Sequence, residues 1–211
     1  MPPQAVTGGN YMDKIITISR EFGAGGHTIG KRVAQELGIE FFDRDIVRET
    51  AKASGFEIDL VEDEGEEISK TGSILKSICA VSSSNYRDTQ DAIHDVQQAI
   101  ILRFAQEGPC VILGRCANVV LQEAGVDCIN VFIHADDVHR AVRVSEMTGS
   151  TNATEIQRLM AKKDASRHNY YNHYTGKKWG DSHNYHMTLD SGALGYDTCV
   201  KLIVAAAQAE G

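Results

Sequence analysis

A glycine-rich run follows a short β-branched segment near the start of the chain. Residues 14–19 read Lys-Ile-Ile-Thr-Ile-Ser, and residues 20–28, which we call the glycine-rich turn, read Arg-Glu-Phe-Gly-Ala-Gly-Gly-His-Thr. Apolar residues then recur at helical spacing from near Thr28 to Leu37, and Gly38 ends the pattern. Between a strand and a helix, such a turn lets backbone N–H groups converge on an anion beside the partly positive helix N-terminus. The run therefore predicts a phosphate-binding turn.

Two nucleotide-binding fingerprints compete for this turn. The dinucleotide motif G-x-G-x-x-G fits at its first two glycines but fails at the third, where the chain has Thr28. The P-loop motif G-x-x-x-x-G-K-[ST] fits in two registers. One runs from Gly25 to Lys31 and places the lysine a turn too deep in the helix. The other places Arg20 at the first glycine and Gly26 at the lysine, and it ends on Thr28, where kinases of the G-K-G-T type carry threonine.

The elements that must position this turn alternate between strands and helices. Apolar runs predict further strands at 39–42, 110–114 and 128–133, and a last short one at 186–189. Helical patterns cover residues 28–37, 88–107, 136–147, 154–167 and 196–207, whereas 170–185 is aromatic, basic and irregular. Because strands that alternate with helices and are apolar on both faces belong to parallel sheets, we expect an α/β, doubly wound fold.

Composition excludes several classes of protein. The 211 residues suit one domain, and no apolar run is long enough to span a bilayer. A net charge of −8 argues against binding a nucleic acid polymer, which needs a basic face, but leaves room for a local pocket for a small anion.

The ends and the cysteines point to the cytoplasm. Residues 1–13 have neither a basic start nor an apolar stretch, so we expect a flexible leader and no signal peptide. The five cysteines are odd in number, widely spaced and mostly in apolar segments, as is typical of reduced core thiols.

Several separate segments share one resemblance. They are Ile16 to Gly26, Gly114-Arg115, Val131 to Ala135 with Arg140, Asp164 to Trp179, and Leu189 to Gly195. Together they resemble the cytidylate kinase-like family, a divergent branch of the P-loop nucleotide kinases. The resemblance implies a single P-loop NTPase domain, which is a three-layer sandwich with a parallel sheet. It also implies a helical acceptor-binding insertion at about 43–107 and a lid region at about 150–185.

The resemblance implies roles for particular residues. The predicted catalytic residues are Arg20, Arg115, Asp164 and Arg167. The predicted ATP-binding residues are Gly23, Ala24, Gly25, Gly26, His27, Thr28 and Lys31, and Thr28 is also the predicted Mg²⁺ ligand. The predicted acceptor-binding residues are Asp43, Arg44, Arg48 and Arg115. Each role has an alternative interpretation. The predicted arginines and Lys31 could be solvated surface charges or ion-pair partners, and the polar residues that follow residue 42 could cap a helix.

Two departures from the family pattern bear on activity. Cytidylate kinases proper carry the P-loop lysine where this chain has Gly26, and aspartate where it has Cys116. Since phosphoryl transfer needs several cations around the phosphates together with Mg²⁺, one of Arg20, Lys31, Arg115 and Arg167 must replace the lysine.

The leading hypothesis is an ATP- and Mg²⁺-dependent phosphotransferase acting on a nucleoside monophosphate such as CMP or dCMP. Its partner is a small nucleotide, with no nucleic acid polymer and no membrane, and the chain is a monomer or homodimer. The alternatives are a catalytically weak nucleotide-binding or regulatory protein, a P-loop kinase for another small substrate, and a Rossmann oxidoreductase.

Overall fold

The structure, a computed structural model, describes residues 14–55 and 89–209. The predicted leader at 1–13 lies outside these ranges, as do residues 56–88 in the middle of the predicted acceptor-binding insertion. In the described ranges, the cysteines Cys110, Cys116, Cys128 and Cys199 are free thiols.

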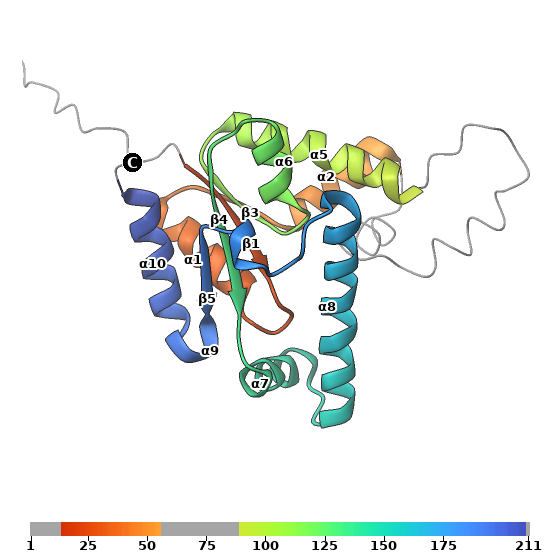
Figure 1. The fold of residues 1–211 in the computed structure, drawn as a ribbon, viewed down its shortest axis with the longest axis vertical. Helices are drawn as coiled ribbons and strands as arrows, with labels where there is room; N and C mark the ends of the chain where they lie inside the picture. Colours follow the sequence, from red (N-terminus) through yellow and green to blue (C-terminus); the bar gives the residue numbers. More distant parts are fainter. Residues whose placement is uncertain (1–13, 56–88, 210–211) are drawn as a thin grey trace, which may run out of the picture.

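A parallel sheet of five strands forms the centre of the molecule (Figure 1). The strands are β1 (Ile15–Arg20), β2 (Glu40–Phe42), β3 (Cys110–Leu113), β4 (Cys128–His134) and β5 (Met187–Asp190). Their order in the sheet is β2-β3-β1-β4-β5, and every neighbouring pair is parallel. All the carboxyl ends therefore lie along one edge, where open α/β sheets bind their ligands.

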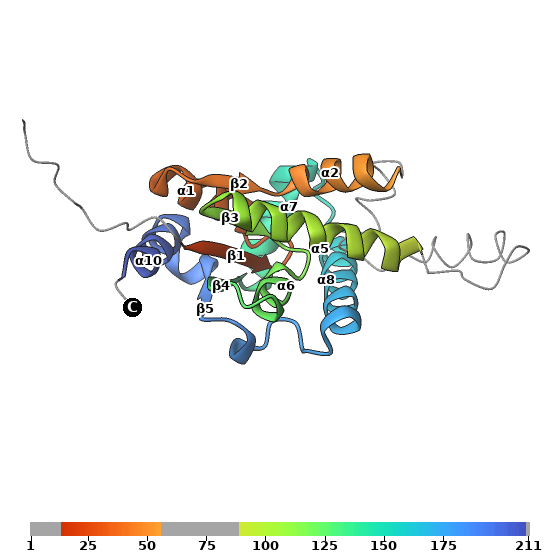
Figure 2. The ribbon, with the colours of Figure 1, turned by 90° about the horizontal axis from the view of Figure 1, so that it is seen from above.

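Helices cover both faces of this sheet. They are α1 (Gly26–Leu37), α2 (Arg44–Ser54), α5 (Thr89–Glu107), α6 (Ala117–Glu123), α7 (Asp137–Thr148), α8 (Ala153–Thr175), a 3-10 turn (Ser182–Asn184), α9 (Ser191–Leu194) and α10 (Tyr196–Gln208). Helices α1 and α10 pack together over one face, whereas α5 and α6 lie over the other (Figures 1 and 2). The result is a three-layer sandwich.

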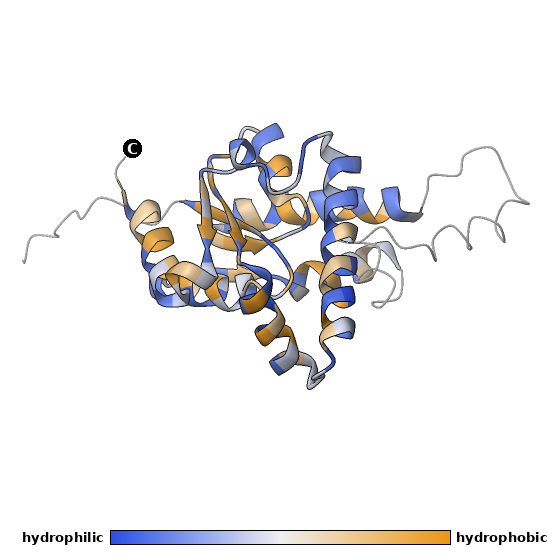
Figure 3. Cartoon of the chain, turned by 60° about the horizontal axis from the view of Figure 1, so that its bottom comes forward, coloured by the Kyte–Doolittle hydropathy of each residue, from blue (hydrophilic) through white to orange (hydrophobic). Residues whose placement is uncertain are grey.

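The two faces of β1 differ in polarity. Ile16 and Ile18 are fully buried in the apolar cluster under α1 and α10. Ile15 belongs to the opposite cluster, under α5 and α6. Because side chains alternate along a strand, Thr17 and Ser19 follow Ile15 on that second face, which therefore becomes polar towards the carboxyl end. Figure 3 shows the central strands largely hydrophobic and the outer helices mixed.

Helix α8 is longer than the sequence predicted. It begins after Asn152, whose side chain accepts hydrogen bonds from two backbone N–H groups, and it continues to Thr175, where Gly176 with φ 65° ends it. The interpretation of 170–185 as irregular was therefore wrong as far as Thr175. The tyrosines, histidines and asparagines of residues 168–175 have modest helix propensity, but no glycine or proline interrupts this part of the helix. The packing of Tyr170 and Tyr171 in a buried cluster stabilises the helix there despite that propensity.

The predicted strands and helices otherwise match the structure within a few residues, and the predicted α/β three-layer fold is confirmed. Among residues 14–55 and 89–209, no helix combines the length and the apolar character needed to cross a bilayer. The roles of 43–107 as acceptor-binding insertion and of 150–185 as lid stay predictions.

Candidate functional site

The glycine-rich turn connects β1 to α1 as the sequence predicted. Strand β1 ends at Arg20, and Gly23 and Gly25 have φ of 85° and 78°, a region that suits glycine. Helix α1 starts at Gly26, earlier than the expected start near Thr28. The sequence pattern placed the start too late because glycine has low helix propensity and Gly25 and Gly26 stand at this end of the helix. Its first N–H groups consequently lie next to the turn, where they favour an anion.

Helices from elsewhere in the chain press against this turn. A Cβ atom on Gly23 would lie 2.8 Å from the carbonyl oxygen of Arg140, and one on Gly25 would lie 2.2 Å from Cζ of Tyr196. The Ser191 hydroxyl donates a hydrogen bond to the carbonyl oxygen of Ala24 at 2.7 Å. The turn is thus held between α7 and the segment that follows β5.

Arg140 on α7 connects the turn to α8. Its guanidinium, whose side chain is 8% exposed, donates to the carbonyl oxygen of Phe22 at 2.9 Å and pairs with Glu21 at 3.1 Å. It also pairs closely with Asp164, which accepts the N–H of Phe22 at 2.8 Å. Asp164, which the sequence predicted to be catalytic, therefore already has two partners within the protein: the guanidinium of Arg140 and the N–H of Phe22.

Three consecutive left-handed residues follow β3. Gly114, Arg115 and Cys116 have φ of 77°, 54° and 56°, and positive φ is unfavourable for the two residues that are not glycine. The Gly114 N–H donates to the carbonyl oxygen of Ile18 at 3.0 Å, which fixes the turn against β1. Such strain persists where surrounding structure over-determines it, and it is concentrated at functional sites.

This strained turn holds a buried arginine with unused hydrogen-bond donors. Arg115 is 5% exposed, and its Nε and Nη1 atoms make no hydrogen bond with any described residue. The nearest carboxylate recorded for it is Asp43, whose Oδ1 lies 3.7 Å from Nη1, too far for a good hydrogen bond. Asp43 itself lies 2.9 Å from Nδ1 of His27 at the start of α1. A buried guanidinium with free donors has high affinity for an anion, because unpaired burial is costly.

A cleft brings two of the predicted residues, Arg20 and Arg167, together. Its volume is about 250 Å³, including space open to solvent, and it is lined by Ser19, Arg20, Gly114, Cys116, Arg167, Tyr170, Tyr171 and Trp179. Nη1 of Arg167 donates to the carbonyl oxygen of Arg20 at 3.3 Å, so α8 is tied to the end of β1. The cleft thus joins the carboxyl ends of β1 and β3 to α8.

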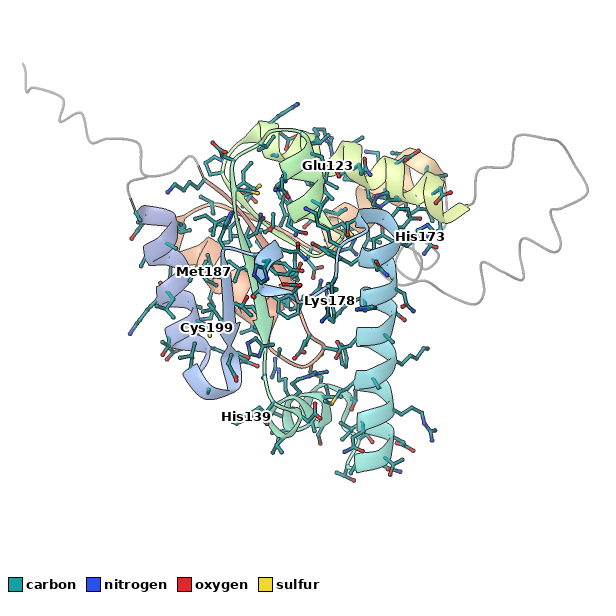
Figure 4. The ribbon with its side chains drawn as sticks, viewed as in Figure 1. Glu123, His139, His173, Lys178, Met187 and Cys199 are labelled. Carbon is teal, nitrogen blue, oxygen red and sulfur yellow. The ribbon has the colours of Figure 1, made fainter. Side chains whose placement is uncertain are left out.

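Aromatic residues form the α8 side of this cleft. Asn118 of α6 donates to the Tyr171 hydroxyl at 2.9 Å, and burial raises the pKa of Tyr171, which keeps the hydroxyl neutral. Trp179 comes from the segment between α8 and β5, where Lys178 is labelled in Figure 4, and packs edge-on against Phe132 at 5.2 Å. A wall of this kind suits the planar face of a base or another apolar ring.

Behind the wall, His94 of α5 supports Tyr170. Its Nδ1 lies 2.7 Å from the Tyr170 hydroxyl, and its ring stacks on Tyr174 at 3.7 Å. Figure 4 labels His173 on the end of α8 that lies against α5. His94 is 5% exposed, and burial, partly opposed by Asp95 and Asp91, lowers its pKa from 6.5 to about 4.

The lowered pKa of His94 predicts acid-sensitive stability. Between pH 6.5 and 4 the unfolded chain binds a proton at His94 that the folded chain does not, so the free energy of unfolding falls as the pH falls. We expect wild type to lose about 2 kcal/mol more than His94→Gln between pH 7.5 and pH 5, measured by urea unfolding. His183→Gln, at a side chain that is 93% exposed, is the control and should lose as much as wild type. Equal losses in wild type and His94→Gln would contradict the assignment.

The remaining predicted residues lie apart from the cleft lining. Lys31 is exposed in the second turn of α1, and Arg48 is exposed and pairs with Asp45 at 2.9 Å. Thr28 lies half-buried in the first turn of α1. Arg44 is the first residue of α2, and its side chain is outside what the structure describes.

Sequence reasoning missed the residues that hold the turn from behind. Arg140 was noted only as part of a resemblance, and Tyr196 and Ser191 were not given roles. Their contacts join residues separated by 118 positions or more in the chain. No spacing pattern signals such a contact, although an arginine in the helix after a buried strand is a reason to look for one.

Proteins of known family and structure share this fold. The model of a family described as the cytidylate kinase-like family matches residues 15–193. A crystal structure of an uncharacterised protein from Eubacterium ventriosum is 26% identical, with a TM-score of 0.70, covering 93% of this chain and 99% of that one. A search of curated proteins finds no match.

Two kinases resemble the chain in fold alone. Shikimate kinase from Bacteroides thetaiotaomicron is 11% identical, with a TM-score of 0.53 and coverage of 93% of this chain and 99% of that one. A gluconokinase from Sinorhizobium meliloti is 15% identical, with a TM-score of 0.51 and coverage of 93% and 92%.

Proposed function

We propose that this chain, which belongs to the cytidylate kinase-like family, is an ATP-dependent phosphotransferase whose acceptor is a nucleoside monophosphate such as CMP or dCMP. The observation that carries the proposal is the buried Arg115, whose Nε and Nη1 atoms have no hydrogen-bond partner among the described residues. It follows the strand next to β1, so its turn lies beside the glycine-rich turn. An anion site and a phosphate-binding turn thus adjoin, as transfer between two phosphorylated molecules requires.

The donor side suits a polyphosphate. The backbone of the glycine-rich turn is held open by Gly23 and Gly25, and the first N–H groups of α1 point towards it. Arg20 and Arg167 line the adjoining cleft and supply positive charge. Positioned cations are the main requirement of phosphoryl transfer, because charge is spread over the transferring oxygens.

The acceptor side suits a phosphate monoester with a ring attached. Arg115 offers two unused donors to the phosphate, and the aromatic wall of the cleft offers a surface to the base. Asp43, held by His27, is positioned to accept hydrogen bonds from a sugar or base.

An oxygen donor suited to Mg²⁺ lies at the end of the glycine-rich turn. Thr28 in the first turn of α1 is the residue that would hold it, directly or through water. Bound Mg²⁺ neutralises phosphate charge during transfer.

A coupled phosphotransfer assay with ATP and Mg²⁺ tests the proposal. We expect turnover with CMP or dCMP and much less with shikimate or gluconate, which lack the dianionic phosphate that Arg115 would bind. Turnover with none of CMP, dCMP, UMP and AMP, by protein that is shown to be folded, would overturn it. Turnover only with shikimate or gluconate would instead favour a kinase for another small substrate.

A second candidate function is a nucleotide-binding protein with weak or no turnover. The observation that favours it is Gly26 at the position of the P-loop lysine. Calorimetry decides between the two: tight ATP binding without turnover on any acceptor supports the binding protein.

A further inference from the structure

Gly26 occupies a position where the backbone does not require glycine. It is the first residue of α1, and it is not among the glycines with positive φ, in contrast to Gly23 and Gly25. Glycine loses more backbone entropy on folding than alanine, which costs about 1 kcal/mol in a helix interior, so the helical backbone does not favour glycine at this position. The glycine at this position therefore has another physical cause.

The cause is the side chain of Arg20. A Cβ atom on Gly26 would lie 2.6 Å from Cβ of Arg20, 2.8 Å from its Cγ and 3.6 Å from its Cδ. Gly26 is buried, and the aliphatic stem of Arg20 covers it. No larger residue fits at position 26 while Arg20 has this conformation.

These are two of the positions at which the chain departs from the P-loop motif, and His27 is a third. In the register that fits the strand end, Arg20 stands at the first glycine of the motif and Gly26 at its lysine. The structure brings these two departures into direct contact. The large cationic residue and the glycine have in effect exchanged positions.

We propose that Arg20 supplies, from the end of β1, the positive charge that a P-loop lysine supplies from the start of the helix. The inference rests on the proposed function, since it assumes a nucleoside triphosphate in the glycine-rich turn. Arg20 lines the cleft together with Arg167, whose Nη1 bonds to the Arg20 carbonyl oxygen. Its ligand is the terminal part of a polyphosphate, which a guanidinium binds through two oxygens where an ammonium acts as a point charge.

The first experiment separates charge from packing. Arg20→Met keeps a stem over Gly26 and removes the guanidinium, so we expect about 10- to 100-fold weaker binding of ATP with Mg²⁺ by calorimetry, in a variant that urea unfolding shows to be folded. Arg20→Lys should fall between wild type and Arg20→Met. Arg143→Met is the control, because Arg143 is half-exposed on α7, lies outside the cleft lining and, among the described residues, forms an ion pair with Glu146 alone; this variant should bind ATP as wild type does.

The second experiment reverses the exchange. Gly26→Lys alone should unfold at lower urea concentration than wild type, since its side chain collides with Arg20. Arg20→Gly alone should lose ATP affinity. The double variant Arg20→Gly/Gly26→Lys, which restores the first glycine and the lysine of the motif, should recover stability relative to Gly26→Lys and ATP affinity relative to Arg20→Gly.

The outcomes separate this inference from the proposed function. Equal ATP affinity in wild type and Arg20→Met would overturn the proposed role of Arg20 and leave the kinase proposal standing. The same conclusion would follow if the losses of Gly26→Lys and Arg20→Gly were simply additive in the double variant. Failure of folded wild type to bind ATP with Mg²⁺ would overturn both.

Discussion

Replacing Arg115 by methionine is expected to remove phosphotransfer while leaving the fold at least as stable as in wild type. Arg115 is 5% exposed, two of its nitrogen atoms make no hydrogen bond with the described residues, and its ion pair with Asp43 is long at 3.7 Å, so the folded protein carries the cost of a weakly paired buried charge. Methionine has a similar volume and no charge, and replacing buried charges by packed apolar groups is often neutral or stabilising. The backbone strain at φ 54° is the same for both residues.

The loss of activity should appear on the acceptor side. Removing one partner of a buried charge pair costs about 2–5 kcal/mol, so we expect kcat/KM for the acceptor to fall about 30- to 5000-fold. ATP affinity by calorimetry should change little. Arg115→Lys keeps the positive charge and should recover part of the activity. The recovery should be incomplete, because an ammonium cannot bind two oxygens in the fork geometry of a guanidinium.

Arg143→Met on α7 is again the matched control for Arg115→Met, with stability and kcat/KM close to wild type. If Arg115→Met instead lowers the free energy of unfolding by more than about 2 kcal/mol, the guanidinium is a structural partner and the acceptor assignment is wrong.

Replacing Arg140 by methionine is expected to have the opposite pattern, with a large loss of stability. Arg140 is paired with Glu21 and Asp164, whose side chains are 27% and 19% exposed. Without it, two partly buried carboxylates remain near one another and near the glycine-rich turn. We expect a loss of about 3–5 kcal/mol in the free energy of unfolding. Weaker ATP binding should follow, because the turn loses its tie to α7.

A second substitution tests this cause. Adding Asp164→Asn to Arg140→Met removes one unpaired charge while keeping an oxygen for the N–H of Phe22, so the double variant should recover part of the lost stability in urea unfolding. Strictly additive losses would show that Arg140 acts through packing alone. Hydrogen exchange at residues 21–26 gives an independent measure, with faster exchange expected in Arg140→Met.

Most of the fold could be predicted because its strands are buried on both faces. The runs that became β3 and β4 are apolar in nearly every position, and glycines mark the ends of α1 and α8. The family resemblance and the P-loop fold are confirmed. The start of α1 and the end of α8 were misjudged, since glycine, tyrosine and histidine there follow tertiary packing against their own propensity.

The site was less predictable than the fold. Residue types and neighbours in sequence indicated Arg20, Arg115 and Arg167, and the structure places Arg20 and Arg167 in one cleft. Sequence could not show that Asp164 is taken by Arg140, or that the Arg20 stem covers Gly26. Both facts depend on contacts between side chains that are far apart in the sequence. Hydrophobic periodicity predicts which residues are buried, but it does not predict which side chains contact one another.

Helix α8 is tied to the rest of the molecule at its middle and near its carboxyl end. Asp164 binds Arg140 and the turn, while Tyr171 and Tyr174 are bonded to Asn118 of α6 and Asp91 of α5. A helix that is bonded to its neighbours at two separated points resists rotation about either point. Because these contacts reach α5, α6 and α7, a movement of α8 relative to the sheet requires either that they break or that these helices move with it.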